Sequence, residues 1–175
     1  MKILIATENH FAGYGGPYYA IGNKLVYLLK NKVKFKLIYK KTDNFNYRLN
    51  LDEIIDEFDI VHIYGIWRPF YYTIFNIAKK KNKKIFISPL GALEPWSLSQ
   101  KKFKKKIAFW LYQKKILNNV DQIHATSEIE KKNIVDLGIR TKITVIPHGI
   151  EILEEKKKKF KPKTNEKSYF FFKNS

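Results

Sequence analysis

A glycine-rich loop near the start of the chain has the residues of a phosphate-binding turn. Gly15 and Gly16 precede Pro17, which stands where the first turn of a helix is expected. Backbone N–H groups at such a helix start can bind a phosphate, and the helix dipole favours negative charge there. A tight turn that needs glycine backbone angles explains the same residues. Tyr18 occupies the third small position of a dinucleotide-binding fingerprint, and no G-K-[ST] sequence occurs, so neither nucleotide motif is met.

His62 and two tryptophans could contact a hydroxylated substrate. His62 lies in the run D-I-V-H-I-Y, close to Trp67. Its imidazole could act as a base or bind a substrate hydroxyl, but a histidine on a buried strand can also be a hydrogen-bonded core residue. Trp67 and Trp96 could each offer an apolar face to a sugar ring, or could belong to the core and its rim. The residues alone leave both interpretations open.

The stretch Ser88–Trp96 reads S-P-L-G-A-L-E-P-W and follows the β-prone run at 84–88. Prolines and a glycine directly after a strand lead the chain out of its sheet at a defined angle. Loops after the carboxyl ends of parallel strands are where open α/β sheets bind ligands. The stretch is therefore either an ordinary strand-to-helix connection or part of a binding edge.

The composition excludes several kinds of site. The chain has no cysteine, which excludes disulfides, thiolate nucleophiles and cysteine-based zinc sites and fits a reducing compartment. His10, His124 and His148 show no metal-ligand spacing, and no D-x-D sequence is present to hold Mg²⁺ or Mn²⁺. We therefore expect no metal site.

Basic residues dominate the charge of the chain. It has 34 Lys and Arg against 16 Asp and Glu, a formal net charge of +18, and nearly all the basic residues are Lys. Sequence-specific nucleic-acid binding relies on bidentate Arg contacts, so this excess indicates attraction to anionic surfaces in general and makes an anionic membrane a better partner than nucleic acid. No apolar run approaches the roughly 20 residues of a membrane span. We expect a cytoplasmic chain, either soluble or peripheral on the inner face of the membrane.

A lysine-rich helix is predicted at 97–119. One side of it is apolar, with Phe103, Ile107, Trp110, Leu111 and Leu117. Lysines occupy much of the rest, chiefly Lys101, Lys102, Lys104, Lys105 and Lys106. Two interpretations fit this pattern. The apolar side packs on the core and the lysines are solvated, or the helix docks on anionic lipid, with each Lys contributing about 1 kcal/mol.

These candidate residues are set in an alternation of strands and helices. Apolar or alternating runs predict strands at 2–6, 33–39, 59–64, 84–88, 121–126 and 143–146. Helical spacing predicts helices at 17–31, 51–57, 69–81, 97–119 and 127–137. The alternation is typical of an α/β domain with one Rossmann-like parallel sheet flanked by helices and right-handed crossovers. Loops at strand ends should then converge on one cleft.

The domain boundary is predicted near residue 150. Residues 1–150 form the α/β domain, whereas 151–175 begin with a highly charged stretch that includes four consecutive lysines at 156–159. The apolar run at 169–172 has the composition of a strand that is just starting. We expect 151–175 to be a linker followed by the first residues of a second domain that this chain does not contain.

Four segments resemble the amino-terminal half of retaining glycosyltransferases of family 4, which have the two-domain GT-B fold. The segments are D-I-V-H-I-Y-G-I-W at 59–67, S-P-L-G-A-L-E-P-W-S-L at 88–98, H-A-T-S-E-I-E at 124–130 and I-T-V-I-P-H-G-I-E at 143–151. The second segment is similar to the pattern of bacterial polysaccharide and lipopolysaccharide enzymes. In order and spacing, the resemblance covers about residues 1–151.

The resemblance implies transfer of a sugar from a nucleotide-sugar donor to a glycan or lipid-linked acceptor, without a metal or another cofactor. It places Gly15 and Gly16 at the donor phosphates. It assigns the acceptor side of the cleft to His62, Trp67, Leu90 and Gly91, with Glu94 and Trp96 shaping the loop.

Two departures from the family pattern limit the resemblance. Leu90 stands where many members carry His, so a sugar-orienting role of that His does not transfer. We also expect the donor-binding domain to be missing, so that the chain is either a truncated transferase or one subunit of a split enzyme and has no transferase activity by itself. Two alternatives are a basic membrane- or nucleic-acid-binding module and a nucleotide-cofactor domain.

Overall fold

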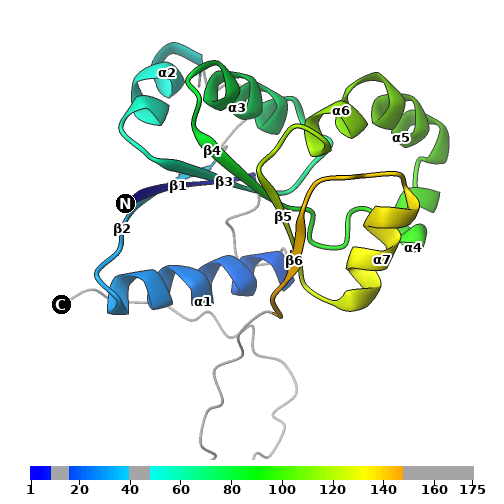
Figure 1. Cartoon of the computed structure of the whole chain (residues 1–175), viewed down its shortest axis with the longest axis horizontal. Helices are drawn as coiled ribbons and strands as arrows, with labels where there is room; N and C mark the ends of the chain where they lie inside the picture. Colours follow the sequence, from blue (N-terminus) through cyan, green and yellow to red (C-terminus); the bar gives the residue numbers. More distant parts are fainter. Residues whose placement is uncertain (9–15, 40–47, 148–175) are drawn as a thin grey trace, which may run out of the picture.

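The computed structural model describes residues 1–8, 16–39 and 48–147, which form an α/β domain around one sheet (Figure 1). The sheet has six strands in the order β2-β1-β3-β4-β5-β6, and every pairing is parallel. The strands are β1 (Lys2–Thr7), β2 (Lys34–Tyr39), β3 (Ile60–Tyr64), β4 (Lys84–Ser88), β5 (Gln122–Ala125) and β6 (Ile143–Val145). The predicted fold class and all six predicted strands are confirmed.

Helices connect the strands. They are α1 (Gly16–Lys30), α2 (Arg48–Asp56), α3 (Pro69–Lys80), α4 (Pro95–Ser99), α5 (Lys102–Ala108), the π-helix η1 (Phe109–Gln113), α6 (Lys114–Leu117) and α7 (Glu128–Asp136). Figure 1 shows α1 on one side of the sheet and α2, α3, α5 and α6 on the other. Parallel strands need such crossovers, and these cover the apolar faces of the sheet.

The core lies on both faces of the sheet because successive strand residues point to opposite sides. On β1, Leu4 and Ala6 join the large buried cluster beneath α2, α3 and α6, whereas Ile5 joins a smaller cluster with Ile21 and Leu28 of α1. The apolar strands are thus explained by burial on both faces.

The helix predicted at 97–119 is wrong as one continuous element. Gln100 is extended (φ −71°, ψ 123°) and Lys101 is left-handed (φ 52°, ψ 41°), so α4 ends before α5 begins. Farther on, the π-helix η1 accommodates an extra residue in its turn, which changes the residues that face the sheet.

The apolar side predicted for this segment does not pack into the core as a unit. Leu117 is fully buried, but the other four residues, Phe103, Ile107, Trp110 and Leu111, are exposed. Phe109 and Gln113 of η1 take the inward positions instead. The core-packing interpretation is therefore wrong for most of this apolar side, because the break and the π turn rotate it away from the sheet.

No helix within the described ranges is long and apolar enough to cross a membrane. The predicted linker and strand start at 151–175 lie outside the described residues, as does Gly15 of the predicted phosphate loop. Gly16 is the first residue of α1, so α1 begins at the predicted position.

Candidate functional site

The candidate site lies at the carboxyl edge of the sheet. Thr7 of β1 pairs with Tyr64 of β3, which in turn pairs with Ser88 of β4, so these strands end level with one another. Glu8, Gly65 and the loop at 89–94 therefore start from neighbouring positions. The strand register brings together segments that are far apart in the sequence.

Gly65 allows the chain to leave β3 directly above an aromatic ring. Its φ is +122°, and a Cβ atom built there would lie 2.6 Å from the Tyr71 hydroxyl oxygen. That hydroxyl accepts a hydrogen bond of 2.9 Å from the backbone N–H of Glu8. Burial raises the pKa of Tyr71 to about 12, which keeps the phenol neutral. Only glycine fits this position, because it adopts the positive φ readily and has no Cβ atom to clash with Tyr71.

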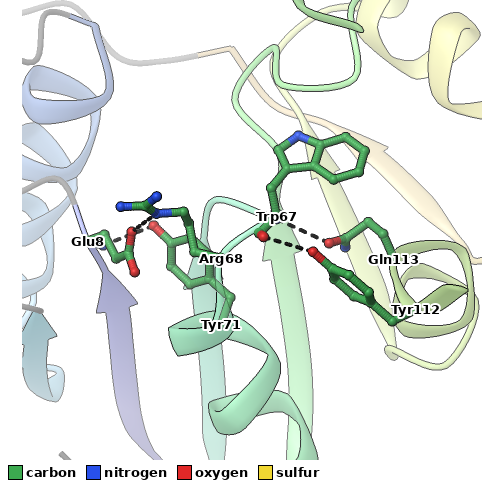
Figure 2. A network of polar contacts seen from close by, with 6 residues as sticks. All are labelled: Glu8, Trp67, Arg68, Tyr71, Tyr112 and Gln113. Carbon is green, nitrogen blue, oxygen red and sulfur yellow. Dashed lines mark hydrogen bonds and ion pairs between the residues drawn. The ribbon is translucent and has the colours of Figure 1, made fainter. Parts of the chain in front are cut away.

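Arg68 and Glu8 form an ion pair across the ends of β3 and β1 (Figure 2). The Arg68 Nε donates to a Glu8 carboxylate oxygen at 2.6 Å. The Arg68 side chain is 63% exposed at this edge. Guanidinium groups recognise carboxylates and phosphates through paired donors. Neither residue was predicted from the sequence, although Arg68 is a rare arginine in a strand-end loop.

Trp67 adopts a strained backbone that two side chains hold in place (Figure 2). Its φ is +76°, which is unusual for a residue with a side chain. The Trp67 N–H donates to Gln113 Oε1 at 3.1 Å, and the Tyr112 hydroxyl donates to the Trp67 carbonyl oxygen at 2.8 Å. The indole Nε1 donates to the Ala92 carbonyl at 3.3 Å. The ring is thus fixed beside the loop at 89–94.

The π-helix η1 supplies both supports of Trp67. Tyr112 and Gln113 are consecutive residues of η1, and both side chains reach the same peptide segment. Gln113 is buried, and partial burial raises the pKa of Tyr112. A π turn inside a helix is frequently found at functional sites. Backbone strain supported in this way is typical of binding and catalytic loops.

A buried carboxylate, Glu130 of α7, fixes the loop after β4. Leu90 and Gly91 both have positive φ, at 57° and 75°. The Gly91 N–H donates to Glu130 Oε1 at 2.7 Å. The other carboxylate oxygen accepts from the Thr126 N–H at 2.7 Å and from its hydroxyl at 2.8 Å. Three donors stabilise this buried charge, and they join the loop to the end of β5.

Glu130 was not predicted as a site residue, although the sequence contains a signal for it. The S-E-I-E run at 127–130 is a capping-box pattern, and Ser127 does accept from the Glu130 N–H as the N-cap of α7. In a capping box the carboxylate returns to the cap residue, whereas here it reaches Thr126 and Gly91. The local pattern identifies the helix start but not the distant partner.

Glu94 and Trp96 differ in their surroundings. Glu94 precedes α4 and accepts a hydrogen bond from the side-chain amide of Asn133 on α7. Trp96 is 76% exposed on α4. The Glu94 contact joins the loop to α7, and the predicted shaping of the loop by Glu94 and Trp96 stays a prediction. Acceptor binding by any of these residues stays a prediction.

His62 belongs to a hydrogen-bonded chain on the α1 side of the sheet. Lys24 Nζ lies 3.1 Å from His62 Nδ1, and His62 Nε2 lies 2.8 Å from the Ser88 hydroxyl. That hydroxyl lies 2.8 Å from His124 Nδ1, and His124 Nε2 lies 2.7 Å from the Ile146 carbonyl oxygen. His62 is only 5% exposed, which corresponds to the core interpretation of this residue.

The donors and acceptors in this chain of hydrogen bonds follow from its last member, the Ile146 carbonyl oxygen. A carbonyl oxygen cannot donate, so His124 Nε2 carries a proton and its Nδ1 accepts from Ser88. The same reasoning makes His62 Nε2 the donor to Ser88 and its Nδ1 the acceptor from Lys24. Desolvation lowers the pKa of both histidines and lowers that of Lys24 to about 8. Both imidazoles are therefore neutral at neutral pH.

Leu90 packs beside Tyr64 against the small core cluster on the α1 side. The buried Tyr64 hydroxyl has no hydrogen-bond partner among the described residues, and burial raises its pKa. At the position where many resembling enzymes carry His, this chain therefore has an apolar contact. Among the described residues, no group of three or more His, Asp or Glu is arranged to hold a metal ion.

Comparison with known proteins agrees with the observed fold. The family described as Glycosyltransferase Family 4 matches residues 14–152. No curated protein matches the chain. A solved structure, the crystal structure of Anabaena Alr3699/HepE in complex with UDP-glucose, superimposes with a TM-score of 0.59 at 13% sequence identity. The match covers 87% of this chain but only 45% of that one.

The structural match supports the fold alone, because the identity is low, and this chain spans less than half of the other protein's length. The family match covers most of the chain, from the glycine-rich loop to the segment after β6. The chain therefore belongs to glycosyltransferase family 4.

Proposed function

We propose that this chain is the acceptor-side part of a retaining glycosyltransferase, which moves a sugar from a nucleotide-sugar to a glycan or lipid-linked acceptor in bacterial polysaccharide or lipopolysaccharide synthesis. The observation that carries this proposal is Trp67, whose strained backbone is held by Tyr112 and Gln113 at the carboxyl edge of a family 4 domain. A fixed indole beside a loop is a suitable surface for the apolar face of a sugar.

The residues around Trp67 provide polar recognition. The exposed part of the Arg68 guanidinium can bind an anionic group of the acceptor or donor. Glu94 and the backbone of Gly91 are held by α7, so the loop keeps its shape when a ligand arrives. Gly15 and Gly16 at the start of α1 would face the donor phosphates, where the helix dipole favours negative charge.

Donor binding requires a further domain in this proposal. The protein named HepE was crystallised with UDP-glucose, and this chain covers 45% of its length. The remaining part of a two-domain enzyme would hold the nucleotide-sugar, so this chain would be inactive by itself. Incubating the purified chain with UDP-glucose and a protein-free extract of bacterial lipids and oligosaccharides should give no turnover. Turnover without another protein would overturn this part of the proposal.

Acceptor binding is tested by saturation-transfer NMR with a panel of neutral and acidic bacterial oligosaccharides. We expect Trp67→Ala to weaken binding about fivefold to tenfold, as loss of one aromatic contact implies. Trp110→Ala is the matched control, because Trp110 is exposed on η1 and should leave oligosaccharide binding unchanged. Equal binding by wild type and Trp67→Ala would remove Trp67 from the site.

The chain also associates peripherally with an anionic membrane in this proposal, through the surface of α5 and η1. Phe103 and Leu111 are 83% and 74% exposed there, and Lys101, Lys102, Lys104 and Lys106 are exposed around them. Apolar side chains flanked by lysines are typical of interfacial helices. The double variant Phe103→Ser/Leu111→Ser should lose flotation with phosphatidylglycerol vesicles. Unchanged flotation, or retention on random DNA with no vesicle binding, would contradict this part.

A further inference from the structure

A groove lies between the surface of α4, α5 and η1 and the end of α7. Its volume is about 640 Å³, within the range of small-ligand sites. Its apolar lining includes Leu98, Phe109, Trp110 and Leu137. Of these residues, Phe109 is buried and Trp110 is exposed. The groove adjoins the Trp67 edge, because Lys105 Nζ lies 5.8 Å and the centroid of the Phe109 ring 6.4 Å from the Trp67 ring centroid.

Lysines surround this apolar lining. Lys102, Lys105, Lys106 and Lys114 all line the groove, and Asp136 is the one acidic residue beside them. The Lys105 amine donates to the Ser97 carbonyl and hydroxyl, and the Lys114 amine lies 4.7 Å from the Trp110 ring centroid. Within the described part of the chain, no hydrogen bond or ion pair engages the side-chain amine of Lys102 or Lys106. Two amines are thus available at the rim.

The combination of lining and rim selects a class of ligand. An apolar base is unsuitable for a small hydrophilic anion, which loses water there without compensation. A neutral hydrocarbon would use the apolar lining but would gain nothing from the lysines beside it. An amphiphile with one aliphatic chain and an anionic head group satisfies both parts.

The position of the groove favours a membrane lipid as the source of that amphiphile. On α5, Lys102, Lys105 and Lys106 share the groove side by helical spacing, and Phe103 and Ile107 follow on the neighbouring stripe. The neighbouring stripe belongs to the surface proposed to meet the bilayer. The groove therefore opens beside that surface.

We infer that the groove holds one anionic membrane lipid, with part of an acyl chain against Leu98, Phe109 and Trp110 and the head-group phosphate between Lys102 and Lys106. The inference rests on the proposed membrane association and adds a specific lipid site to it. It predicts stoichiometric binding, which general electrostatic attraction to a membrane does not.

The test uses monomeric lysolipids and no vesicles, so that it can fail independently of membrane docking and of sugar transfer. Lauroyl-lysophosphatidylglycerol is titrated into the whole chain below its critical micelle concentration, with calorimetry and tryptophan fluorescence as readouts. We expect saturable binding of one lysolipid. Lauroyl-lysophosphatidylcholine, with a zwitterionic head group, should bind at least tenfold more weakly.

Matched variants distinguish binding in the groove from attraction by the net charge of the chain. Lys102→Glu/Lys106→Glu removes the rim amines, and we expect at least a tenfold loss of affinity for the anionic lysolipid. Lys104→Glu/Lys115→Glu makes the same charge change at exposed lysines outside the groove and should alter affinity less than twofold. Likewise Trp110→Ala should weaken binding, and Leu111→Ala should not.

Several outcomes would overturn the inference. Equal losses in the two lysine variants would show attraction by net charge only. Equal affinity for the two lysolipids would show a purely apolar site, and displacement by millimolar inorganic phosphate alone would show an ion site. Displacement by random single-stranded DNA with the same dependence on Lys102 and Lys106 would assign the surface to nucleic acid.

Discussion

The carboxyl edge of the sheet and the surface of α5 and η1 are built in opposite ways, although they share η1. At the edge, Trp67 and the loop at 89–94 are held by side-chain hydrogen bonds from other elements. On the α5 surface, Phe103, Leu111 and most of the neighbouring lysines are exposed. A site that recognises a defined molecule needs fixed groups, whereas a fluid anionic surface can be bound by side chains that are free to adapt.

The contrast predicts that substitutions at the edge destabilise the fold, whereas exposed positions on the α5 surface tolerate change. Gly65→Ala should have the largest effect, since its Cβ would clash with Tyr71 and its φ is positive. We expect a loss of roughly 2–4 kcal/mol in the free energy of unfolding by urea. Gly22→Ala is the matched control within α1, where no described atom beyond the neighbouring residues and the helix backbone lies within 4 Å of the new Cβ, and it should stabilise by about 0.5–1 kcal/mol.

Glu130→Gln should have the next largest effect. Glutamine has one acceptor oxygen where the carboxylate has two, so its amide would face an N–H or hydroxyl donor that now lacks a partner. We expect a loss of about 2 kcal/mol and faster hydrogen exchange at the Gly91 amide. Glu128→Gln, on the exposed side of the same helix turn, should change stability by less than about 0.5 kcal/mol. Unchanged exchange at Gly91 would mean that Glu130 does not hold the loop.

Tyr112→Phe isolates one support of Trp67. Removing the hydroxyl leaves the Trp67 carbonyl oxygen without this donor and should cost about 1 kcal/mol of unfolding free energy. The same variant should weaken oligosaccharide binding, because the strained backbone of Trp67 relaxes. Tyr72→Phe, at a half-exposed ring beside Tyr112, is the control. If oligosaccharide binding is lost equally in both variants, the hydrogen bond to Trp67 is not the cause.

The histidine chain predicts a smaller, pH-dependent effect. The folded-state pKa values of His62 and His124 lie below their ordinary value of 6.5, so the unfolded chain binds more protons as the pH falls through that value. The contribution of these two histidines to stability should therefore be complete above pH 6.5 and should decline as the pH falls toward 5. Urea unfolding of wild type and of His62→Gln/His124→Gln across this range measures the effect. A slope that persists in the double variant would assign it to other groups.

Lys24 also makes the stability of the folded chain rise with pH, but at higher pH than the histidines do. Its pKa is lowered from 10.5 to about 8, so the unfolded chain binds the extra proton between these values and stability should rise with pH across that interval. The effect is a penalty for holding a desolvated ammonium group, and it disappears only above pH 10.5, where the amine is neutral in the folded and the unfolded chain.

The alternation of strands and helices could be predicted from the sequence because it depends on the local spacing of apolar residues. Each strand run and the helices at 69–81 and 127–137 were confirmed, since burial on one or both faces leaves a period in the sequence itself. The four family segments were likewise readable, and their order places them at strand ends. Fold class and family thus follow from residues that are near one another in the chain.

Three features of the segment at 97–119 could not be predicted from the sequence. They are the break at Gln100–Lys101, the π turn, and the outward rotation of Phe103 and Trp110. A lysine-rich run with helical spacing does not show which of its sides meets the sheet, because that depends on the contacts η1 makes with Trp67.

The sequence by itself determined the α/β alternation, the excess of Lys and the membership of family 4. The tertiary structure alone decided that Glu130 holds Gly91, that His62 is joined to His124 through Ser88, and that the apolar side of α5 faces outward. The physical reason is distance along the chain. These contacts join residues dozens of positions apart, and only the parallel register of β3, β4 and β5 brings them within hydrogen-bonding range.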